Sequence, residues 1–426
     1  MGNCEKNFYL LNYCDSCLHI MQEKGEIESL TADELTLNNG NEAGKYCLSC
    51  GQPLPNALIK DGEGGLELLE SALSNKNLKV ICFTAPSVRV SLGDEFGCPA
   101  GENVVGKMVS ALKKLGFHAV FDMNTAADFT ILEEASEFVS RLKTGKNLPM
   151  FTSCCPGWVN FAKKVYPKLL KNLTTCKSPQ QMFGTLINNI YAPKNNLRST
   201  DIFVVSIVPC LAKKLELKAE GINTSVGLDV DVAITTKEIA KLIKLRGIDF
   251  NKLENEKFDS FFGASSGAGA IFGNTGGVME AVLRTACDSL TKTELNNLDY
   301  KMVRGLDGIK RAQIKAGDKT INIAVVTGLK NVGSIISEIE KEPNKYQFIE
   351  VMACEGGCVG GGGQPTVYGQ DRESVLKARA KGLYDSELKM QVRKAHNNPA
   401  VLEIYKKYLG KVGGKKAKEL LHRKYD

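Results

Sequence analysis

The sequence has little of what marks a membrane-bound, secreted or nucleic-acid-binding protein. None of its 426 residues lies in an uninterrupted apolar run of about 20 residues, the length that a membrane-spanning helix needs. The segment MGNCEKNFYL lacks the basic region and apolar run of a signal peptide. Aromatic residues are not interleaved with the basic ones, as they are on single-strand-binding surfaces. We therefore expect a cytoplasmic protein whose partners include neither a membrane nor a nucleic acid.

Histidine is also scarce, with four residues that do not cluster, so a metal site built from imidazoles is not expected. Cysteine is abundant instead, at 14 residues. Because the cytoplasm keeps thiols reduced, so many cysteines indicate metal binding or catalysis rather than disulfides. Soft thiolate ligands suit zinc ions and iron–sulfur clusters.

The chain changes character near residue 52, where a polar, cysteine-rich segment gives way to alternating strand-like and helix-like segments. Apolar residues at helical spacing predict a helix from Val105 to Leu115, and Thr236 is expected to cap the amphipathic helix that follows it. Five β-rich runs are expected to be strands, at 79–85, 118–123, 202–208, 230–235 and 321–328. This alternation predicts an α/β fold with mostly parallel sheets flanked by helices.

Several cysteines follow directly after predicted strands or short apolar runs. Three segments deliver thiols in this way: Cys154 and Cys155 after 150–152, Cys210 after 202–208, and Cys354 after 348–352. Because open parallel sheets place ligands beyond the carboxyl ends of their strands, a shared site is predicted. A lone cysteine is more often a core residue than a ligand, and we assign four others to the core: Cys82, Cys98, Cys176 and Cys287.

These cysteines lie in three distinctive segments: FTSCCPGW (151–158), VPCLAKKLE (208–216) and EVMACEGGCVGGGGQP (350–365). In order and content the segments resemble the signature motifs of FeFe-hydrogenases, TSCCP, PCxxKxxE and ExxxCxxGC. Three further segments also look like that family: APSVRV (85–90), KSPQQMFGT (177–185) and SGAGAIFGNTGGVMEA (266–281). The resemblance implies a two-lobed hydrogenase catalytic domain over residues 79–426.

By this resemblance the site would hold an H-cluster, in which a 4Fe–4S cubane is linked to a diiron unit that carries CO, cyanide and an azadithiolate bridge. Cys358 would join the two parts, and four cysteines would bind the cubane: Cys155, Cys210, Cys354 and Cys358. Lys213 would donate to a cyanide, the anion that a buried ammonium group needs. Four residues would surround the diiron unit: Pro86, Ser87, Gln180 and Met352.

Proton transfer to a shielded metal site requires a continuous chain of exchangeable groups. The resemblance assigns the last donor of this chain to Cys154 and earlier steps to Glu134 and Glu137. The segment ILEEASEFV places these two carboxylates one turn apart on one face of a helix. Thr174 stands where the family usually has a relay serine, and it keeps the hydroxyl.

The segment 1–54 is expected to form a separate metal-binding domain, joined to the rest by a linker helix over 55–78. Its two C-x2-C knuckles can bind one metal site through four thiolates: Cys14, Cys17, Cys47 and Cys50. The second knuckle, CLSCGQPLP, resembles that of a rubredoxin or a zinc ribbon. Iron, zinc and an iron–sulfur cluster are therefore alternatives for this site.

The implied activity is the reversible reduction of protons to H₂ in an anaerobic cell, with electrons from a ferredoxin-type carrier and a diiron unit installed by maturation proteins. Two residues depart from the usual pattern, and both are expected near the cluster: Val208, where most catalytic members have methionine, and Glu355, where they have a small residue, proline or histidine. The alternatives are a sensory hydrogenase of low turnover and a non-catalytic hydrogenase-like iron–sulfur protein. Both groups usually lack the donor cysteine that Cys154 supplies.

Overall fold

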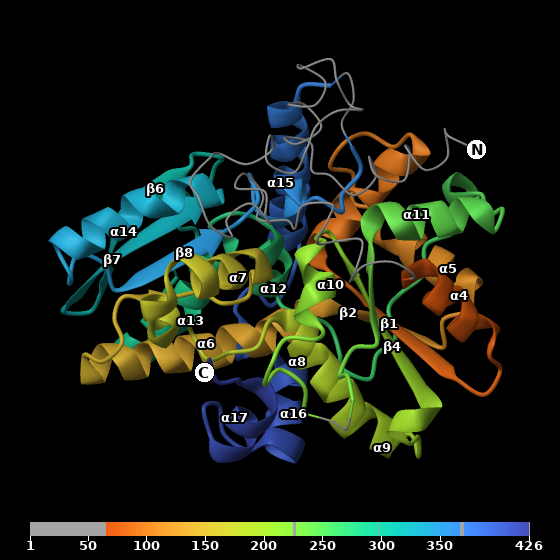
Figure 1. The fold of residues 1–426 in the computed structure, drawn as a ribbon, viewed down its shortest axis with the longest axis horizontal. Helices are drawn as coiled ribbons and strands as arrows, with labels where there is room; N and C mark the ends of the chain where they lie inside the picture. The colour runs from red at the N-terminus through yellow and green to blue at the C-terminus, as the bar shows by residue number, and fades with distance from the viewer. Residues whose placement is uncertain (1–64, 225–226, 297, 367–369, 426) are drawn as a thin grey trace.

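The computed structural model describes residues 65–224, 227–296, 298–366 and 370–425, so the predicted amino-terminal metal site lies outside the described residues. Two four-stranded sheets form the frame of the described part (Figure 1). One has the order β2-β1-β4-β5 and the other β3-β8-β7-β6. The strands are β1 (Lys79–Thr84), β2 (Ala119–Asp122), β3 (Met150–Phe151), β4 (Ile202–Val208), β5 (Val232–Thr235), β6 (Ile309–Ala316), β7 (Lys319–Thr327) and β8 (Phe348–Met352).

The first sheet is parallel throughout, with β1 paired to β2 on one side and to β4 on the other. Its strands are buried along almost their whole length. Such strands are covered on both faces, which explains why they appear in the sequence as nearly continuous apolar runs rather than as alternating ones.

The second sheet is mixed. Strands β3, β8 and β7 run parallel, whereas β6 forms an antiparallel hairpin with β7 at the edge. Alternate residues of β6 are exposed, in keeping with its sequence IKRAQIKA. Because an edge strand buries only one face, β6 carries too little apolar sequence to stand out.

The long helix α6 (Met123–Thr144) crosses the middle of the molecule and packs against α8, α12 and α13 (Figure 1). Most of its residues are buried, including two adjacent glutamates, Glu133 and Glu134. The other α-helices are α4 (Gly65–Ser74), α5 (Val105–Leu115), α7 (Pro156–Val165), α8 (Pro179–Leu186), α9 (Ala192–Lys194), α10 (Ala212–Glu216), α11 (Thr236–Leu245), α12 (Gly267–Ala270), α13 (Gly277–Thr291), α14 (Val332–Lys341), α15 (Arg372–Leu388), α16 (Pro399–Ile404) and α17 (Lys415–Leu421).

The predicted fold class is confirmed, with parallel strands flanked by helices. One local prediction is wrong, because the cap of α11 is Thr235 rather than Thr236. The Thr235 hydroxyl accepts from the Glu238 backbone N–H, and the Glu238 carboxylate accepts from the backbone N–H of Thr235 at 2.7 Å. This reciprocal pair satisfies two donors at the helix start. None of the described helices combines the length and the apolar character of a membrane span.

Candidate functional site

The carboxyl ends of strands from both sheets open into one cavity. From the first sheet, β1 leads into Pro86 and Ser87, and β4 leads into Cys210. From the second, β3 leads into Cys154 and Cys155, and β8 into Cys354. The cavity wall includes the four predicted ligands of the cubane and the six residues predicted to lie around the diiron unit. They are Cys155, Cys210, Cys354 and Cys358, and Pro86, Ser87, Cys154, Gln180, Lys213 and Met352.

The four expected cubane cysteines are spaced for a group larger than a single ion. A tetrahedral zinc site holds its sulfur atoms about 3.8 Å apart. Within the described ranges, no three of the sulfur atoms of Cys155, Cys210, Cys354 and Cys358 lie within 4.8 Å of one another. Three of them, Cys155, Cys210 and Cys358, are nevertheless close enough to interact. Burial, and then the charges of Cys155 and Cys210, raise the pKa of the Cys358 thiol to about 12. A polynuclear cluster fits this donor set, since thiolates coordinated to cationic iron need no protons.

Glycines beside Cys358 allow the segment that carries it to pass closely against neighbouring backbone. Gly357 has φ 86°, and a Cβ there would lie 2.5 Å from the Thr275 backbone nitrogen. A Cβ at Gly361 would lie 2.4 Å from the Pro209 carbonyl oxygen, next to Cys210. Both glycines line the cavity. The lack of a side chain at these glycines thus lets the segment that carries Cys358 pack closely against the segments of Thr275 and Pro209.

Lys213 is nearly buried and has a protein anion as its partner. Its Nζ donates to Glu216 Oε2 at 2.8 Å and to the Cys154 carbonyl oxygen at 3.1 Å. Burial lowers the pKa of Lys213. The charge and hydrogen bond of Glu216, together with the charges of Cys154 and Cys210, outweigh it, so that the pKa lies above its usual value. Glu216 thus supplies an anion for this ammonium group within the protein, and donation from Lys213 to a cyanide stays a prediction. The Lys-x-x-Glu spacing of the motif pointed to Glu216, because residues three apart meet on a helix.

Gln180 is oriented by the same carboxylate. Its Nε2 donates to Glu216 Oε2 at 3.0 Å, and its Oε1 accepts from Ser206 at 2.7 Å. By contrast, the hydroxyl of Ser87 is buried at the cavity wall and has no hydrogen-bond partner among the described residues. A buried polar atom of this kind is costly, so it fits a ligand with a polar group at this point.

The two departures from the motif pattern have different surroundings. Val208 lines the cavity and is buried. Glu355 is not part of the cavity wall, because its side chain is 52% exposed and forms an ion pair with Arg372. Only Val208 is therefore placed to contact a group bound in the cavity.

A second set of polar groups, Glu134, Thr174 and Glu137, lies behind Cys154, outside the cavity wall. The Glu134 carboxylate is buried and lies close enough to Cys154 to raise the pKa of that thiol, after burial itself. Burial and then the charge of Glu137 raise the pKa of Glu134 to about 8, against a hydrogen bond from Thr174 that lowers it. Glu134 Oε2 has no partner in the described part of the protein. Near neutral pH this carboxyl group can therefore both hold and release a proton.

The path continues through residues that sequence reasoning missed. Ser153 Oγ lies 3.2 Å from Thr174 Oγ1, in the middle of the set. Glu137 Oε1 accepts from Arg141 at 2.5 Å, and its Oε2 accepts from Thr175 Oγ1 at 2.9 Å. Glu137 and Thr175 also line a solvent-open cavity of about 910 Å³. The resemblance grouped Cys154, Glu134, Thr174 and Glu137, and in the structure Glu134 interacts with the other three, with Cys154 at the inner cavity and Glu137 at the solvent-open one.

Comparison with known families gives two matches that together span most of the chain. Residues 78–362 match the family described as the iron only hydrogenase large subunit, C-terminal domain. Residues 373–426 match the iron hydrogenase small subunit family. The chain therefore contains, in one polypeptide, segments similar to both of these families.

Individual relatives agree with the family matches. Iron hydrogenase 1 of Clostridium pasteurianum is 45% identical over 84% of this chain, which covers 63% of that relative's length. The structure of an apo FeFe-hydrogenase from Chlamydomonas reinhardtii aligns with a TM-score of 0.75 and 35% identity over 85% of this chain and 98% of that one. A cytosolic Fe-S cluster assembly factor of Xenopus tropicalis is 28% identical over 94% of this chain and 86% of its own length.

Proposed function

The chain belongs to the iron-only hydrogenase family, and from this premise we propose that it catalyses the interconversion of protons and H₂, 2H⁺ + 2e⁻ ⇌ H₂, at an H-cluster. The observation that carries the proposal is the single cavity in which four cluster-forming cysteines meet Cys154 and Lys213. Because the chain covers only 63% of the length of Iron hydrogenase 1, the activity of that longer relative is also only proposed for this chain.

In the proposed holoenzyme the cubane is bound by Cys155, Cys210, Cys354 and Cys358, whose wide spacing suits it. The H-cluster, when bound, supplies electrons and an iron site at which protons are reduced. The chain's own residues exclude water from this site and hold the diiron unit. The Ser87 hydroxyl, which has no partner in the described part of the chain, is a donor available to it.

Protons reach the cavity through Cys154, the last exchangeable group on the path. Its thiol takes a proton from the buried Glu134, which the Thr174 and Ser153 hydroxyls connect toward Glu137. The raised pKa of Glu134 suits this task, because a carrier whose pKa lies near the working pH is neither permanently charged nor permanently protonated. Lys213 lies beside Cys154, where Glu216 keeps its ammonium group charged at the cavity wall.

The proposal extends to partners and compartment. Electrons come from a ferredoxin-type carrier, the diiron unit is inserted by maturation proteins, and the protein works in the cytoplasm of an anaerobic cell. The amino-terminal cysteines Cys14, Cys17, Cys47 and Cys50 bind iron, zinc or an iron–sulfur cluster outside the described residues.

A second candidate is a non-catalytic role in iron–sulfur cluster assembly, which the 28% identity to the Xenopus tropicalis assembly factor favours. Such a role requires thiols for a cluster but no path for protons. It gives no role to the buried Glu134, whose Oε2 has no partner among the described residues, or to the Thr174 hydroxyl that bonds it and the Ser153 hydroxyl next to Thr174. The arrangement therefore supports catalysis over assembly.

The test is H₂ production by the full-length protein, matured anaerobically with the diiron unit and supplied with reduced methyl viologen. We expect the wild type to evolve H₂ and the Cys154→Ala variant to lose at least about 100-fold in rate at equal iron content, as the loss of a proton donor predicts. Cys98→Ala is the matched control, because this partly exposed thiol lies outside the cavity wall. No H₂ from matured wild type would favour the assembly role, and full activity of Cys154→Ala would contradict the proton path.

A further inference from the structure

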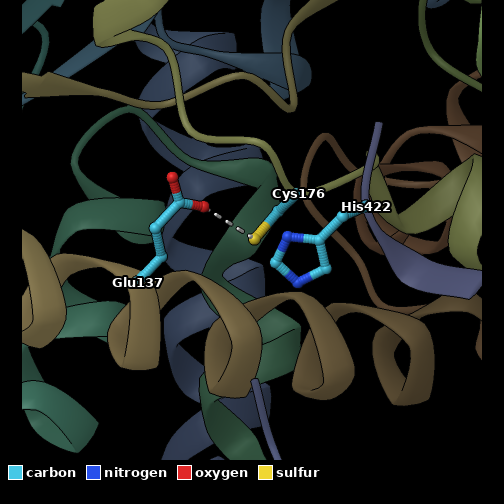
Figure 2. A group of neighbouring side chains, drawn as sticks. All are labelled: Glu137, Cys176 and His422. Carbon is cyan, nitrogen blue, oxygen red and sulfur yellow. Dashed lines mark hydrogen bonds between the residues drawn. The ribbon is translucent and has the colours of Figure 1, made fainter. Parts of the chain in front are cut away.

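Three potential metal ligands from separate segments meet where the proton path reaches solvent (Figure 2). They are Glu137 of α6, Cys176, and His422 directly after α17. One ligand atom of each lies within 4.8 Å of the other two, and Cys176 Sγ is 3.8 Å from Glu137 Oε2. Within the described ranges, this is the one group of three or more such residues that is compact enough for a single ion.

The backbone holds these ligands in place. Cys176 and His422 face each other in an antiparallel bridge, flanked by hydrogen bonds from Lys177 N to Leu421 O at 2.9 Å and from Arg423 N to Thr175 O at 2.7 Å. Glu137 is fixed by Arg141, which binds its Oε1 and leaves Oε2 on the side of Cys176. A cation would therefore meet ligands that are already positioned, with little loss of side-chain entropy.

The histidine ring is oriented as it is in many metal sites. His422 Nε2 lies 2.8 Å from Glu133 Oε2, and the same carboxylate accepts from the Tyr405 hydroxyl and the Gly413 N–H. A ring that donates Nε2–H to a carboxylate keeps the lone pair of its Nδ1 for a metal ion. That Nδ1 lies 2.7 Å from Thr175 Oγ1, on the side of Glu137, and Figure 2 shows the ring nitrogen turned toward the Cys176 sulfur.

We propose that Glu137 Oε2, Cys176 Sγ and His422 Nδ1 form a binding site for Zn²⁺ or a chemically similar divalent cation, with water from the cavity as the fourth ligand. Carboxylate, thiolate and imidazole are the usual ligands of zinc, and three protein ligands plus water are a common set. On binding, the thiol proton of Cys176 passes to solvent, so that two anionic ligands face the cation.

The surroundings select among cations. In the cavity that leads to the site, basic side chains outnumber acidic ones: Arg141, Lys146, Lys163, Lys418, Arg423 and Lys424 against Glu133, Glu137, Glu220 and Glu419. These charges oppose any cation held by electrostatic attraction alone. A cation that bonds strongly to sulfur and nitrogen, such as Zn²⁺ or Cd²⁺, gains enough from its ligands to bind, whereas Mg²⁺, which prefers oxygen ligands and keeps its water, is not expected to bind.

A cation bound at this site would block proton transfer through the relay, an inference that rests on the proposed function. A cation on Glu137 Oε2 displaces the hydrogen bond from the Thr175 hydroxyl and removes this carboxylate as a proton carrier. Bound Zn²⁺ therefore stops proton transfer at Glu137, the outer end of the relay, and leaves the inner cavity unchanged. The site makes proton transfer sensitive to free zinc.

Binding is tested on the cluster-loaded full-length protein by isothermal titration with Zn²⁺, with zinc anomalous diffraction to locate the ion. The amino-terminal cysteines can also bind zinc, so the number of ions per chain is compared between variants. We expect Cys176→Ala and His422→Gln each to bind one Zn²⁺ fewer than the wild type, and Cys98→Ala to bind the same number. Glu133→Gln, which removes no ligand but alters the support of the histidine, should weaken this site by about 10- to 100-fold. Equal numbers in wild type and Cys176→Ala, or an anomalous peak elsewhere only, overturn the site.

The effect on the relay is tested separately. Zn²⁺ should slow H₂ production by the wild type, relative to its own zinc-free rate, but not that of Cys176→Ala, and Mg²⁺ should slow neither. Zinc bound at this site without inhibition would overturn the closure of the relay while leaving the site intact. If matured wild type produces no H₂ at all, the proposed function fails, and the binding experiment still decides the zinc site.

Discussion

Replacing Glu134 with glutamine removes a buried ionisable group and keeps its shape. The carboxyl group has an ordinary pKa of 4.5, which burial and the charge of Glu137 raise to about 8 in the folded protein. At pH 7 the unfolded chain has released this proton and the folded one retains it, so folding must take a proton up. The cost is about 1.4 kcal/mol for each pH unit above the ordinary value, or about 3 kcal/mol at pH 7 and about 5 kcal/mol above pH 8. The neutral glutamine avoids this cost.

We therefore expect Glu134→Gln to be more stable than the wild type, and less active. Thermal unfolding at pH 7, followed by the fluorescence of the buried Trp158, should show a midpoint higher by up to about 4 °C. The difference should shrink as the pH falls toward 5 and grow toward pH 8.5, because the raised pKa destabilises the folded state only above the ordinary value. H₂ production should fall at least about 100-fold.

Glu137→Gln is the matched control, one helical turn away. Glu137 is paired with Arg141 and accepts two hydrogen bonds from Thr175, so its replacement leaves a largely buried guanidinium without its anion. This variant should lose about 1–3 kcal/mol of stability, the opposite sign. A Glu134→Gln midpoint that is unchanged at both pH 7 and pH 8.5 would refute the buried neutral carboxyl group, and retained turnover would refute its place in the relay.

Three further predictions concern Lys213, Glu355 and the amino-terminal cysteines. Lys213→Met should lower the stability by about 3–5 kcal/mol because it leaves Glu216 buried and unpaired, and Lys213→Met with Glu216→Gln should recover most of the loss in thermal unfolding. Glu355→Ala should change stability by less than about 1 kcal/mol and leave the iron content intact, because its ion pair with Arg372 is exposed; a loss of iron would contradict this. Metal analysis of a fragment spanning the amino-terminal C-x2-C knuckles should find one metal site per chain, and replacing one cysteine of each knuckle with serine should abolish it.

Much of the fold could be predicted from the sequence because the first sheet is buried on both faces. Its strands β1, β2, β4 and β5 coincide closely with the apolar runs expected to be strands. Strand β6 was not predicted, because it lies at an edge and its exposed face is occupied by charged residues. The cap of α11 was misplaced by one residue, since two adjacent threonines offer the same hydroxyl and only the backbone geometry distinguishes them.

The inner cavity could be predicted because its ligands lie in local motifs at strand ends. The outer site could not, because its three ligands come from segments far apart in the chain, and no short motif joins Glu137, Cys176 and His422. Cys176 looked like a core cysteine and is in fact buried, but it also borders the relay. Glu355 was expected near the cluster on the strength of its neighbour Cys354, yet the chain turns its side chain to solvent.

The infrared spectrum of the matured full-length protein tests the central claim most directly. The proposed diiron unit, in the cavity of Cys155, Cys210, Cys354 and Cys358, would carry CO and cyanide, whose stretching bands fall in a region where protein and water absorb little. We expect these bands in the wild type and in Cys154→Ala, since that variant removes a proton donor and not a ligand. Their absence after complete maturation, in a protein that holds its cubane iron, would contradict the assignment of this chain as a hydrogenase.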